Sequence, residues 1–384
     1  MKIAFDAQPL LSGTKSGVGF CEDGLVAALL ELYPENEYML EYFSLRNHDV
    51  KKEKLSKYTQ KKAMLSSCRW FPGSLYRMAS AYVPIPYRLL FPKKKQVTHF
   101  FNYYIPPFVR GKKVVTIHDM TLHIYPETMR KKTLWFLKKV LKASIRRADH
   151  IVTDSAFSKQ EMMKFYNIPE DKISVVLCGV DFERFHPLEN RERLEVIKQK
   201  YNIKKEYFLY LGTLEPRKNL VRFVQAYAKA KNEKRNFPSL VLAGGKGWMY
   251  EEIFSVVQEL GLEKDVIFTG YVQDDEVATL MGGAMAFCFP SLYEGFGMPV
   301  IEAMACGTPV LTSRHSSMEE IAGEESVLVD ALSVDSIKEG LIRLYESEEL
   351  REELSQRGLA KAKQYTWEVA GKQLIQVYQD LVKD

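Results

Sequence analysis

The stretch FPSLYEGFGMPVIEAMACGTPV, residues 289–310, restricts the fold of this chain more than any other. It begins at the end of a short apolar run, which is typical of a buried parallel strand. Gly295 and Gly297 permit tight backbone turns, Pro299 stands where a helix would begin, and Gly307 stands where it would end. The stretch therefore predicts a strand, a loop and a helix, with free backbone N–H groups that form an anion site at the carboxyl end of the strand.

Two glutamates, Glu294 in the loop and Glu302 near the first helical turn, are unexpected beside an anion site. A carboxylate accepts hydrogen bonds from hydroxyl groups, so a ligand that carries both phosphates and sugars would satisfy the whole stretch. The alternative is that the two glutamates only cap and solvate a surface helix.

The segment EGFGMPVIEAMACGTPV closely resembles the Glu-x7-Glu signature of the retaining nucleotide-sugar glycosyltransferases of family 4, the glycosyl transferases group 1. This match is long and therefore specific, unlike an isolated glycine motif. The resemblance implies that Glu294 holds hydroxyls of the transferred sugar and that Glu302 holds the ribose. It also implies a donor-binding role for the intervening residues Gly295, Phe296, Gly297 and Met298.

The length of the chain, its cysteines and its apolar runs limit the number of domains and the class of protein. A chain of 384 residues with 46% hydrophobic content favours two domains of roughly equal size. The five cysteines are scattered, without CxxC spacing, which favours reduced thiols and argues against a zinc site. No stretch approaches the roughly 18 apolar residues that span a bilayer, and Asp6 interrupts the region where a signal peptide would be apolar. We therefore expect a cytoplasmic protein.

Charge is unevenly distributed along the chain. Residues 1–188 hold 30 Lys and Arg against 18 Asp and Glu, a net charge of +12, whereas the rest has a net charge of −7. The positive charge is concentrated at 51–62, 93–95 and 130–132, with the aromatic residues Trp70, Phe71 and Tyr87 between these runs. This pattern predicts an anionic membrane surface as a further partner, and a peripheral location at the inner face of the membrane. The alternative is a solvated charge run beside ordinary core aromatics. We do not expect nucleic acid as a partner.

The beginning of the chain predicts the opening βα unit of a doubly wound domain, with a strand at Lys2–Ala7 and a helix from about Gly19 to Leu32. Between them, Gly17 and Gly19 would let the backbone approach a ligand closely, although a plain tight turn explains a GxG equally well. The family resemblance implies that these glycines face the donor phosphates and the acceptor.

His118 and Asp119 follow the expected strand Lys113–Ile117, at the edge where parallel sheets place ligands. A lone histidine is more often structural. The HD pair after VVTI resembles the mannosyltransferase-like branch of the family, which implies that His118 orients the transferred sugar. A long helix is expected from Glu127 to Arg147, with leucines at core spacing.

The second domain is expected to open with a strand at Tyr207–Gly212, followed by the basic loop TLEPRKNL. Arg217 offers a fork to phosphate oxygens and Lys218 a compact charge, so together they can neutralise a diphosphate leaving group. Cations at a helix start oppose the helix dipole unless an anion is present. GTLEPRKN also resembles the family, with one departure: many members have Arg where this chain has Thr213, which we still assign to the donor site.

The family resemblance covers nearly all of the chain and implies an α/β protein with the GT-B fold, in which two Rossmann-like doubly wound domains face each other across a cleft. It further implies that residues 1–188 hold the acceptor and residues 189–365 mainly the nucleotide sugar, while a helix at 366–384 crosses back to the first domain. As implied by the resemblance, the activity is metal-independent, retaining transfer of a hexose. His118, Arg217, Lys218 and Glu294 would be catalytic.

The favoured reaction moves mannose from GDP-mannose, without a cofactor, to a glycan or lipid-linked acceptor in cell-surface polysaccharide or glycolipid synthesis. Two alternatives stay open. The donor could be a UDP- or dTDP-sugar, or the protein could bind a sugar nucleotide without catalysis.

Overall fold

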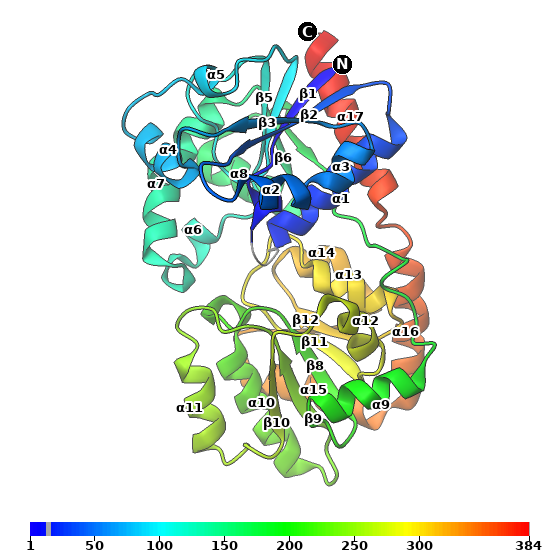
Figure 1. The fold of residues 1–384 in the computed structure, drawn as a ribbon. Helices are drawn as coiled ribbons and strands as arrows, with labels where there is room; N and C mark the ends of the chain where they lie inside the picture. The colour runs from blue at the N-terminus through cyan, green and yellow to red at the C-terminus, as the bar shows by residue number, and fades with distance from the viewer. Residues whose placement is uncertain (13–16, 384) are drawn as a thin grey trace. The chain divides into compact units, whose positions relative to one another are not determined.

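The structure is a computed structural model that describes residues 1–12 and 17–383, which form two compact units (Figure 1). Unit 1 consists of Met1–Ile124, Lys131–Gly179 and Thr366–Asp384, and unit 2 of Tyr125–Arg130 and Val180–Tyr365. The chain therefore enters and leaves unit 2 twice.

Unit 1 is built on a parallel sheet of seven strands, as far as its residues are described, in the order β3-β2-β1-β4-β5-β6-β7. Its strands are almost continuously buried because helices cover both faces of the sheet (Figure 1). The order reverses direction between β1 and β4, which makes this a doubly wound domain. The strands are β1 (Lys2–Asp6), β2 (Glu37–Phe43), β3 (Met64–Cys68), β4 (Val97–Phe100), β5 (Lys112–Thr116), β6 (His150–Thr153) and β7 (Ile173–Val175).

Most strands of unit 1 are followed by one or two helices, although β5 follows β4 without a helix between them. The helices are α1 (Gly17–Leu32), α2 (His48–Lys54), α3 (Ser56–Gln60), α4 (Gly73–Ser80), α5 (Tyr87–Leu90), α6 (Thr121–Ile124), α7 (Lys131–Arg147), α8 (Ala156–Tyr166) and α17 (Trp367–Lys383). The terminal helix α17 packs along α1. Gly24 makes this possible, since a Cβ at that position would lie 2.2 Å from the ring of Trp367.

Unit 2 contains a second parallel sheet, with six strands among its described residues, in the order β10-β9-β8-β11-β12-β13. The strands are β8 (Tyr207–Leu211), β9 (Ser239–Ala243), β10 (Val266–Gly270), β11 (Ala286–Phe289), β12 (Val310–Ser313) and β13 (Val327–Val329). The strand expected at Tyr207–Gly212 is β8, which ends one residue earlier. The strand order reverses between β8 and β11, and the carboxyl ends at such a point are where α/β sheets bind ligands.

Helices also cover both faces of this sheet (Figure 1). They are α9 (Arg191–Lys200), α10 (Leu220–Glu233), α11 (Glu251–Glu259), α12 (Asp274–Gly282), α13 (Met298–Ala305), α14 (Ser317–Ala322), α15 (Val334–Glu346) and α16 (Glu348–Ala362). Helix α9 begins three residues after the domain boundary expected at residue 188. Its N-terminus is capped by Asn190, whose side-chain oxygen accepts a hydrogen bond of 2.9 Å from the backbone N–H of Arg193.

The long helix expected from Glu127 is wrong at its start, because α7 begins only at Lys131. Residues 125–130 instead belong to unit 2, where Trp248 Nε1 donates a hydrogen bond of 2.7 Å to the Thr128 carbonyl. The guanidinium of Arg130 lies 4.7 Å from the centre of the Trp248 ring. These tertiary contacts replace helical hydrogen bonds that the leucine periodicity alone predicted.

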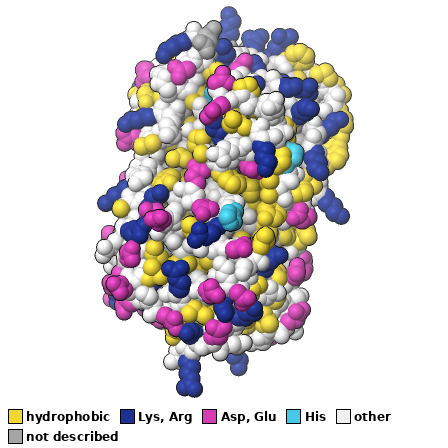
Figure 2. All heavy atoms as spheres, turned by 180° about the vertical axis from the view of Figure 1, so that it is seen from behind, with side chains coloured by type: hydrophobic (Ala, Val, Ile, Leu, Met, Phe, Trp, Pro, Cys, Tyr) yellow, Lys and Arg dark blue, Asp and Glu magenta, His cyan; other side chains and the backbone are white. Residues whose placement is uncertain are grey.

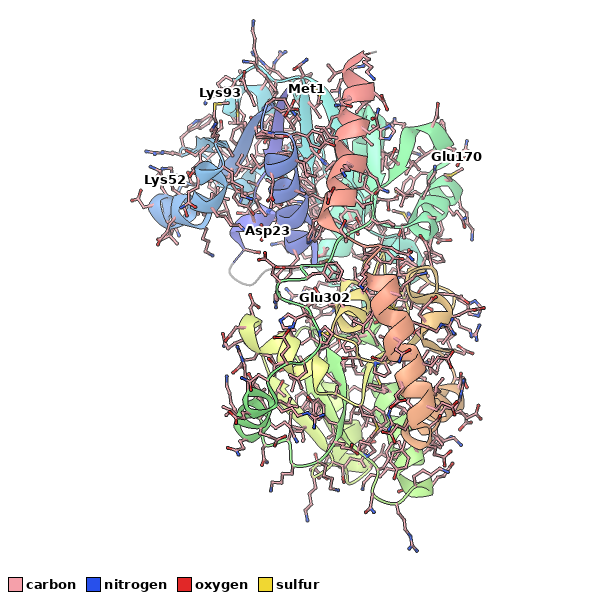
Figure 3. The ribbon with its side chains drawn as sticks, turned by 90° about the vertical axis from the view of Figure 1, so that its right-hand side faces the viewer. Met1, Asp23, Lys52, Lys93, Glu170 and Glu302 are labelled. Carbon is pink, nitrogen blue, oxygen red and sulfur yellow. The ribbon has the colours of Figure 1, made fainter. Side chains whose placement is uncertain are left out.

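Part of the basic and aromatic stretch expected at a membrane is buried. Tyr87 is 2% exposed, and Lys95 forms a buried ion pair with Glu41. Trp70 is exposed, and Lys52 and Lys93 also lie at the surface (Figure 3). None of the described helices is both long and apolar enough to span a bilayer. The five cysteines, all in the described residues, are buried free thiols.

Candidate functional site

The carboxyl ends of β8 and β11 bring the predicted phosphate-binding and sugar-binding residues together. These strands are parallel neighbours, with Phe208 in register with Ala286. Arg217 and Lys218 lie in a short 3₁₀ turn after β8, and Glu294 lies in the loop after β11. Because both strands end at the same edge of the sheet, side chains that are far apart in the sequence meet here.

Glu294 is the centre of this cluster and contacts both cations. Its Oε2 lies 2.5 Å from Arg217 Nη1, and its Oε1 accepts a hydrogen bond of 2.6 Å from Lys218 Nζ. Arg217 also donates 2.8 Å hydrogen bonds to the carbonyl of Tyr293 and to Oε1 of Glu215. The guanidinium therefore connects the turn after β8 to the loop after β11.

The charges of this cluster determine what it can bind. Burial raises the pKa of Glu294, but the charges of Arg217 and Lys218 outweigh it and lower this pKa to about 2. Burial also lowers the pKa of Lys218, together with the charge of Arg217 and against the attraction of Glu294. At neutral pH Glu294 is a carboxylate, which can only accept hydrogen bonds, so it suits the hydroxyls of a sugar.

The loop between Glu294 and α13 presents its backbone rather than its side chains. Gly297 has a φ of +95°, in the left-handed region that favours glycine, and caps α13 at its N-terminus. Phe296 is buried, with its ring centre 6.0 Å from that of Tyr365. Ser317 fixes the loop by donating a 2.7 Å hydrogen bond to the carbonyl of Glu294. Gly295–Met298 can therefore serve a donor through their main chain, at a helix start that favours anions.

Glu302 lies on α13, one helical turn beyond this loop, and is labelled in Figure 3. It is partly buried. Burial raises the pKa of its carboxyl, the charge of Arg184 opposes this, and the charge of Asp181 adds to it, so that the pKa is raised to about 7. Glu302 thus differs from Glu294, since its pKa lies near neutral pH. The charge of Arg184 lowers this pKa less than burial raises it.

Glycines that follow the neighbouring strand β9 allow backbone conformations and close contacts that a side chain would prevent. Gly244, after β9, has a φ of +147°, and a Cβ there would lie 1.9 Å from the carbonyl oxygen of Gly212. Glycine at this position is therefore required for close approach of two strand ends. A Cβ on Gly245 would meet nothing within 4 Å. Thr213 is exposed, beside the cluster in sequence, and its carbonyl accepts a 3.0 Å hydrogen bond from the Tyr210 hydroxyl.

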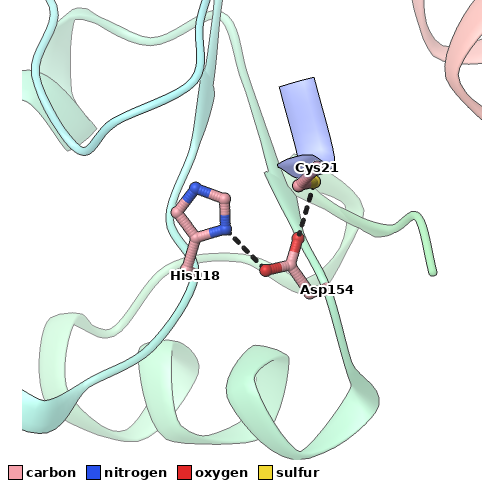
Figure 4. A group of neighbouring side chains, drawn as sticks. All are labelled: Cys21, His118 and Asp154. Carbon is pink, nitrogen blue, oxygen red and sulfur yellow. Dashed lines mark hydrogen bonds and ion pairs between the residues drawn. The ribbon is translucent and has the colours of Figure 1, made fainter. Parts of the chain in front are cut away.

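Unit 1 holds the other predicted catalytic residue, His118, in a buried group with Asp154 and Cys21 (Figure 4). His118 Nδ1 lies 2.5 Å from Asp154 Oδ2, and Nε2 lies 2.7 Å from the carbonyl oxygen of Phe101. The thiol of Cys21, from α1, lies 4.0 Å from Asp154 Oδ1. Because a carboxylate and a carbonyl are both acceptors, both ring nitrogens of His118 carry a hydrogen.

Electrostatics agree with this protonated form. Burial acts to lower the pKa of His118, but the adjacent Asp154 carboxylate outweighs it and raises this pKa to about 10. The potential ligand atoms of Cys21, His118 and Asp154 lie within 4.8 Å of one another. However, two ligands of a tetrahedral zinc ion lie about 3.4 Å apart, farther than the 2.5 Å between Nδ1 and Oδ2. The spacing is that of a charge-assisted hydrogen bond.

Gly17 and Gly19 lie in the first turns of α1, and Gly19 is buried. The helix thus starts two residues earlier than expected, and the glycines belong to it rather than to a preceding loop. A Cβ on Gly17 would meet nothing within 4 Å. The rest of the predicted glycine and serine loop, residues 13–16, lies outside the described residues.

Three residues of these clusters were not singled out from the sequence: Glu215, Asn219 and Asp154. Glu215 is 3% exposed and holds Arg217, and the buried amide of Asn219 donates to the carbonyls of Pro290 and Ala331 at 3.0 and 2.7 Å. Both flank the PRK turn, so the motif EPRKN contained the signal. Asp154 ends the strand β6 next to β5, and this topological position was its only signal.

Comparisons with known proteins place the chain in a family. Residues 193–361 match the family model of the glycosyl transferases group 1, and residues 65–184 match that of Glycosyltransferase Family 4. O-antigen chain mannosyltransferase B of Escherichia coli is 35% identical over 304 residues, which cover 76% of this chain and 78% of the relative. Serotype-specific mannosyltransferase WbdA of the same species is 31% identical over 59% of this chain, and that match spans only 28% of WbdA.

Solved structures agree on the fold. The crystal structure of Anabaena Alr3699/HepE in complex with UDP-glucose superposes with a TM-score of 0.73 at 17% identity, over 99% of this chain and all of that one. WaaG, a glycosyltransferase involved in lipopolysaccharide biosynthesis, superposes with a TM-score of 0.69 at 15% identity, over 98% of this chain and 99% of that one. The chain therefore belongs to the family 4 glycosyltransferases, the glycosyl transferases group 1, which are retaining hexosyltransferases with the GT-B fold.

Proposed function

We propose that this enzyme transfers mannose from GDP-mannose to a glycan or lipid-linked acceptor in the synthesis of a cell-surface polysaccharide or glycolipid. The observation that carries the proposal is the contact of Arg217 and Lys218 with Glu294, where two parallel strands of unit 2 end. This cluster combines donors for a diphosphate with an ionised acceptor for sugar hydroxyls. In our proposal the donor is held mainly by residues 189–365 and the acceptor by residues 1–188.

In this mechanism the diphosphate of the donor lies between the PRK turn and the start of α13. Arg217 and Lys218 neutralise its oxygens, and the backbone N–H groups of Gly295–Met298 add donors at the positive end of the helix dipole. Glu302 accepts hydrogen bonds from the ribose, and Glu294 accepts them from the transferred sugar. Thr213, Gly17 and Gly19 complete the proposed donor contacts.

The chemical step breaks the bond between the anomeric carbon and the β-phosphate oxygen of the donor. Negative charge develops on the departing diphosphate, and Arg217 and Lys218 stabilise it most strongly at that moment. The acceptor hydroxyl then forms a new bond to the anomeric carbon on the same face, and its proton moves to the departing phosphate oxygen. The positive charge of His118, held by Asp154, orients the sugar. These side chains supply positive charge, so we expect activity without a metal ion.

The choice of mannose rests on the relatives, two of which are mannosyltransferases by name at 31 to 35% identity. A UDP-sugar is the second candidate donor, because the Alr3699/HepE structure with the same fold contains UDP-glucose. The first of these relatives acts on an O-antigen chain by name. By analogy, the acceptor of this enzyme would be a growing glycan, either free or linked to a lipid.

A thermal-shift screen tests the proposal. A ligand that binds only the native state raises the melting temperature in proportion to ln(1 + [L]/Kd), so GDP and GDP-mannose should outperform UDP, dTDP and their sugars. Each nucleotide is tested with and without EDTA, and EDTA should leave the shift and the sugar-transfer rate unchanged. A larger shift with UDP would favour the second candidate. No shift with any nucleotide would contradict the donor site.

A further inference from the structure

One surface of unit 1 combines exposed aromatic side chains with lysines. We call it the basic aromatic face and define it by Tyr82, Val83, Trp135, Lys138, Lys139 and Lys142, from the end of α4 and from α7. Tyr82, Val83 and Trp135 are 55%, 59% and 48% exposed. Figure 2 shows hydrophobic side chains gathered beside Lys and Arg at the upper right, the side on which α4 and α7 lie in this view.

The aromatic and basic groups form one continuous surface. The ring centres of Tyr82 and Trp135 are 5.8 Å apart, and Lys139 Nζ lies 5.0 Å from the centre of the Tyr82 ring. On α7, Lys138, Lys139 and Lys142 follow Trp135 at spacings of three, four and seven residues, so all lie on the same helix face. This face of α7 is exposed, whereas its opposite face, which includes Leu137 and Leu141, is buried.

Negative charge is absent from the sequence around this face. Helix α7 contains seven Lys and Arg and no Asp or Glu. Residues 54–118, which include α4 and the loop that carries Tyr82 and Val83, contain no Asp or Glu either. The basic aromatic face is thus cationic and also exposes apolar side chains. A purely solvated face would normally mix both signs of charge and would not expose a tryptophan, a tyrosine and a valine together.

We propose that the basic aromatic face binds the surface of an anionic lipid bilayer, an inference that rests on the lipid-linked acceptor of the proposed function. Trp and Tyr favour the boundary between headgroups and acyl chains, and lysines beside them reach anionic headgroups while their stems cover apolar surface. A soluble polyanion would bind the lysines but would gain nothing from the exposed side chain of Val83. The observations therefore favour a bilayer over a dissolved acid polymer.

This assignment differs from the one that the sequence alone favoured, the basic runs at 51–62, 93–95 and 130–132, of which 51–62 is the longest. Lysines of that run are engaged within unit 1: Lys57 pairs with Asp23, Lys61 with Glu31 at 2.9 Å, and Lys51 donates to the Phe43 carbonyl at 2.9 Å. Each pairing neutralises a charge or occupies a donor. The lysines of α7 therefore contribute more to the attraction between the protein and a charged membrane.

Co-sedimentation of the full-length protein with vesicles tests the proposal, using pure phosphatidylcholine and a 7:3 mixture of phosphatidylcholine and phosphatidylglycerol. Binding is expected only to the anionic vesicles, and high salt should weaken it. The triple variant Lys138→Gln/Lys139→Gln/Lys142→Gln should bind them about 100-fold more weakly, at about fivefold for each lysine. The matched control Lys204→Gln/Lys205→Gln/Lys264→Gln removes three exposed lysines from unit 2 and should bind as the wild type does.

Fluorescence gives a second readout that separates a bilayer from other anions. Anionic vesicles should shift the wild-type tryptophan emission to the blue, and this shift should be lost in Trp135→Phe, whereas polyphosphate should produce none. Equal binding by the triple variant and the control, or equal binding to neutral vesicles, would overturn the proposal. Binding to polyphosphate alone would also overturn it. None of these readouts requires turnover, so an incorrect donor would show in the thermal-shift screen and leave this result intact.

Discussion

The guanidinium of Arg217 contacts acceptors in the loops that follow two strands. Its removal should therefore leave more than one acceptor without a cationic partner. The guanidinium bonds to Glu215 on one side and to Tyr293 and Glu294 on the other. We predict that Arg217→Ala or Lys218→Ala lowers kcat/KM at least ~10²-fold, because each removes a partner of the departing diphosphate. Steady-state kinetics would measure this. Lys229→Ala, an exposed lysine on α10, is the control and should keep the wild-type rate.

Glu294 should affect the sugar and the nucleotide in different ways. Its ionised carboxylate occupies Arg217 and Lys218 in the unliganded protein. We predict that Glu294→Gln leaves the affinity for free GDP unchanged or higher, since both cations become freer to meet phosphate, but weakens binding of GDP-mannose and lowers kcat. Calorimetry with both ligands would decide. Equal losses for GDP and GDP-mannose would show that Glu294 does not recognise the sugar.

Glu302 should show opposite effects on stability and on binding. Burial raises its pKa from 4.5 to about 7 in the folded protein. Between these values the folded state retains a proton that the unfolded state has lost, so stability falls as the pH rises through this window. We predict that Glu302→Gln raises the melting temperature relative to wild type at pH 8 more than at pH 5, while it weakens GDP binding at both. The same difference in melting temperature between Glu302→Gln and wild type at pH 5 and at pH 8 would contradict the raised pKa of Glu302.

The strands that were expected from the sequence, including β1, β5 and β8, were accessible because each is largely buried and therefore appears as a short apolar run. The start of α7 was not, because the contact of Trp248 with Thr128 is tertiary and leaves no local pattern. Glu294, Arg217 and Lys218 were named from their motifs. Their contacts with one another and the role of Glu215 were not predicted, since they depend on which strands become neighbours.

The ends of the neighbouring strands β5 and β6 are joined by His118 and Asp154. In the folded state the pKa of His118 is about 10, against an ordinary value of 6.5, so its stabilising effect is complete below pH 6.5 and is lost as the pH rises through about 10. We predict that Asp154→Asn destabilises the protein most near pH 6 and progressively less toward pH 10. Urea unfolding across this range would measure it.

The control for this element is Asp49→Asn, which makes the same chemical change at an exposed position in α2. This substitution should lower the free energy of unfolding only slightly, and the decrease should not depend on pH. A loss of stability in Asp154→Asn that stays constant from pH 6 to pH 10 would show that Asp154 acts through packing or its bond to Cys21. In that case the positive charge proposed for His118 during transfer would lose its support.

At the scale of the whole molecule, hydrogen exchange can test for each unit separately which of its residues the donor protects. The diphosphate and ribose contacts, Arg217, Lys218 and Glu302, belong to unit 2, whereas Gly17, Gly19 and His118 belong to unit 1. Hydrogen exchange reports the local openings that a bound ligand suppresses. We therefore predict that GDP slows exchange at 212–218 and 293–302, and that an unreactive GDP-mannose analogue also slows it at 17–21 and 116–119. Because the strands under these segments are buried already, protection should be confined to the loops and helix starts.

Protection by GDP that is restricted to unit 1 would reverse the assignment of the donor to unit 2. An identical pattern with both ligands would remove His118 and the two glycines from the donor site, and would leave the α1 and β5 ends available for the acceptor alone.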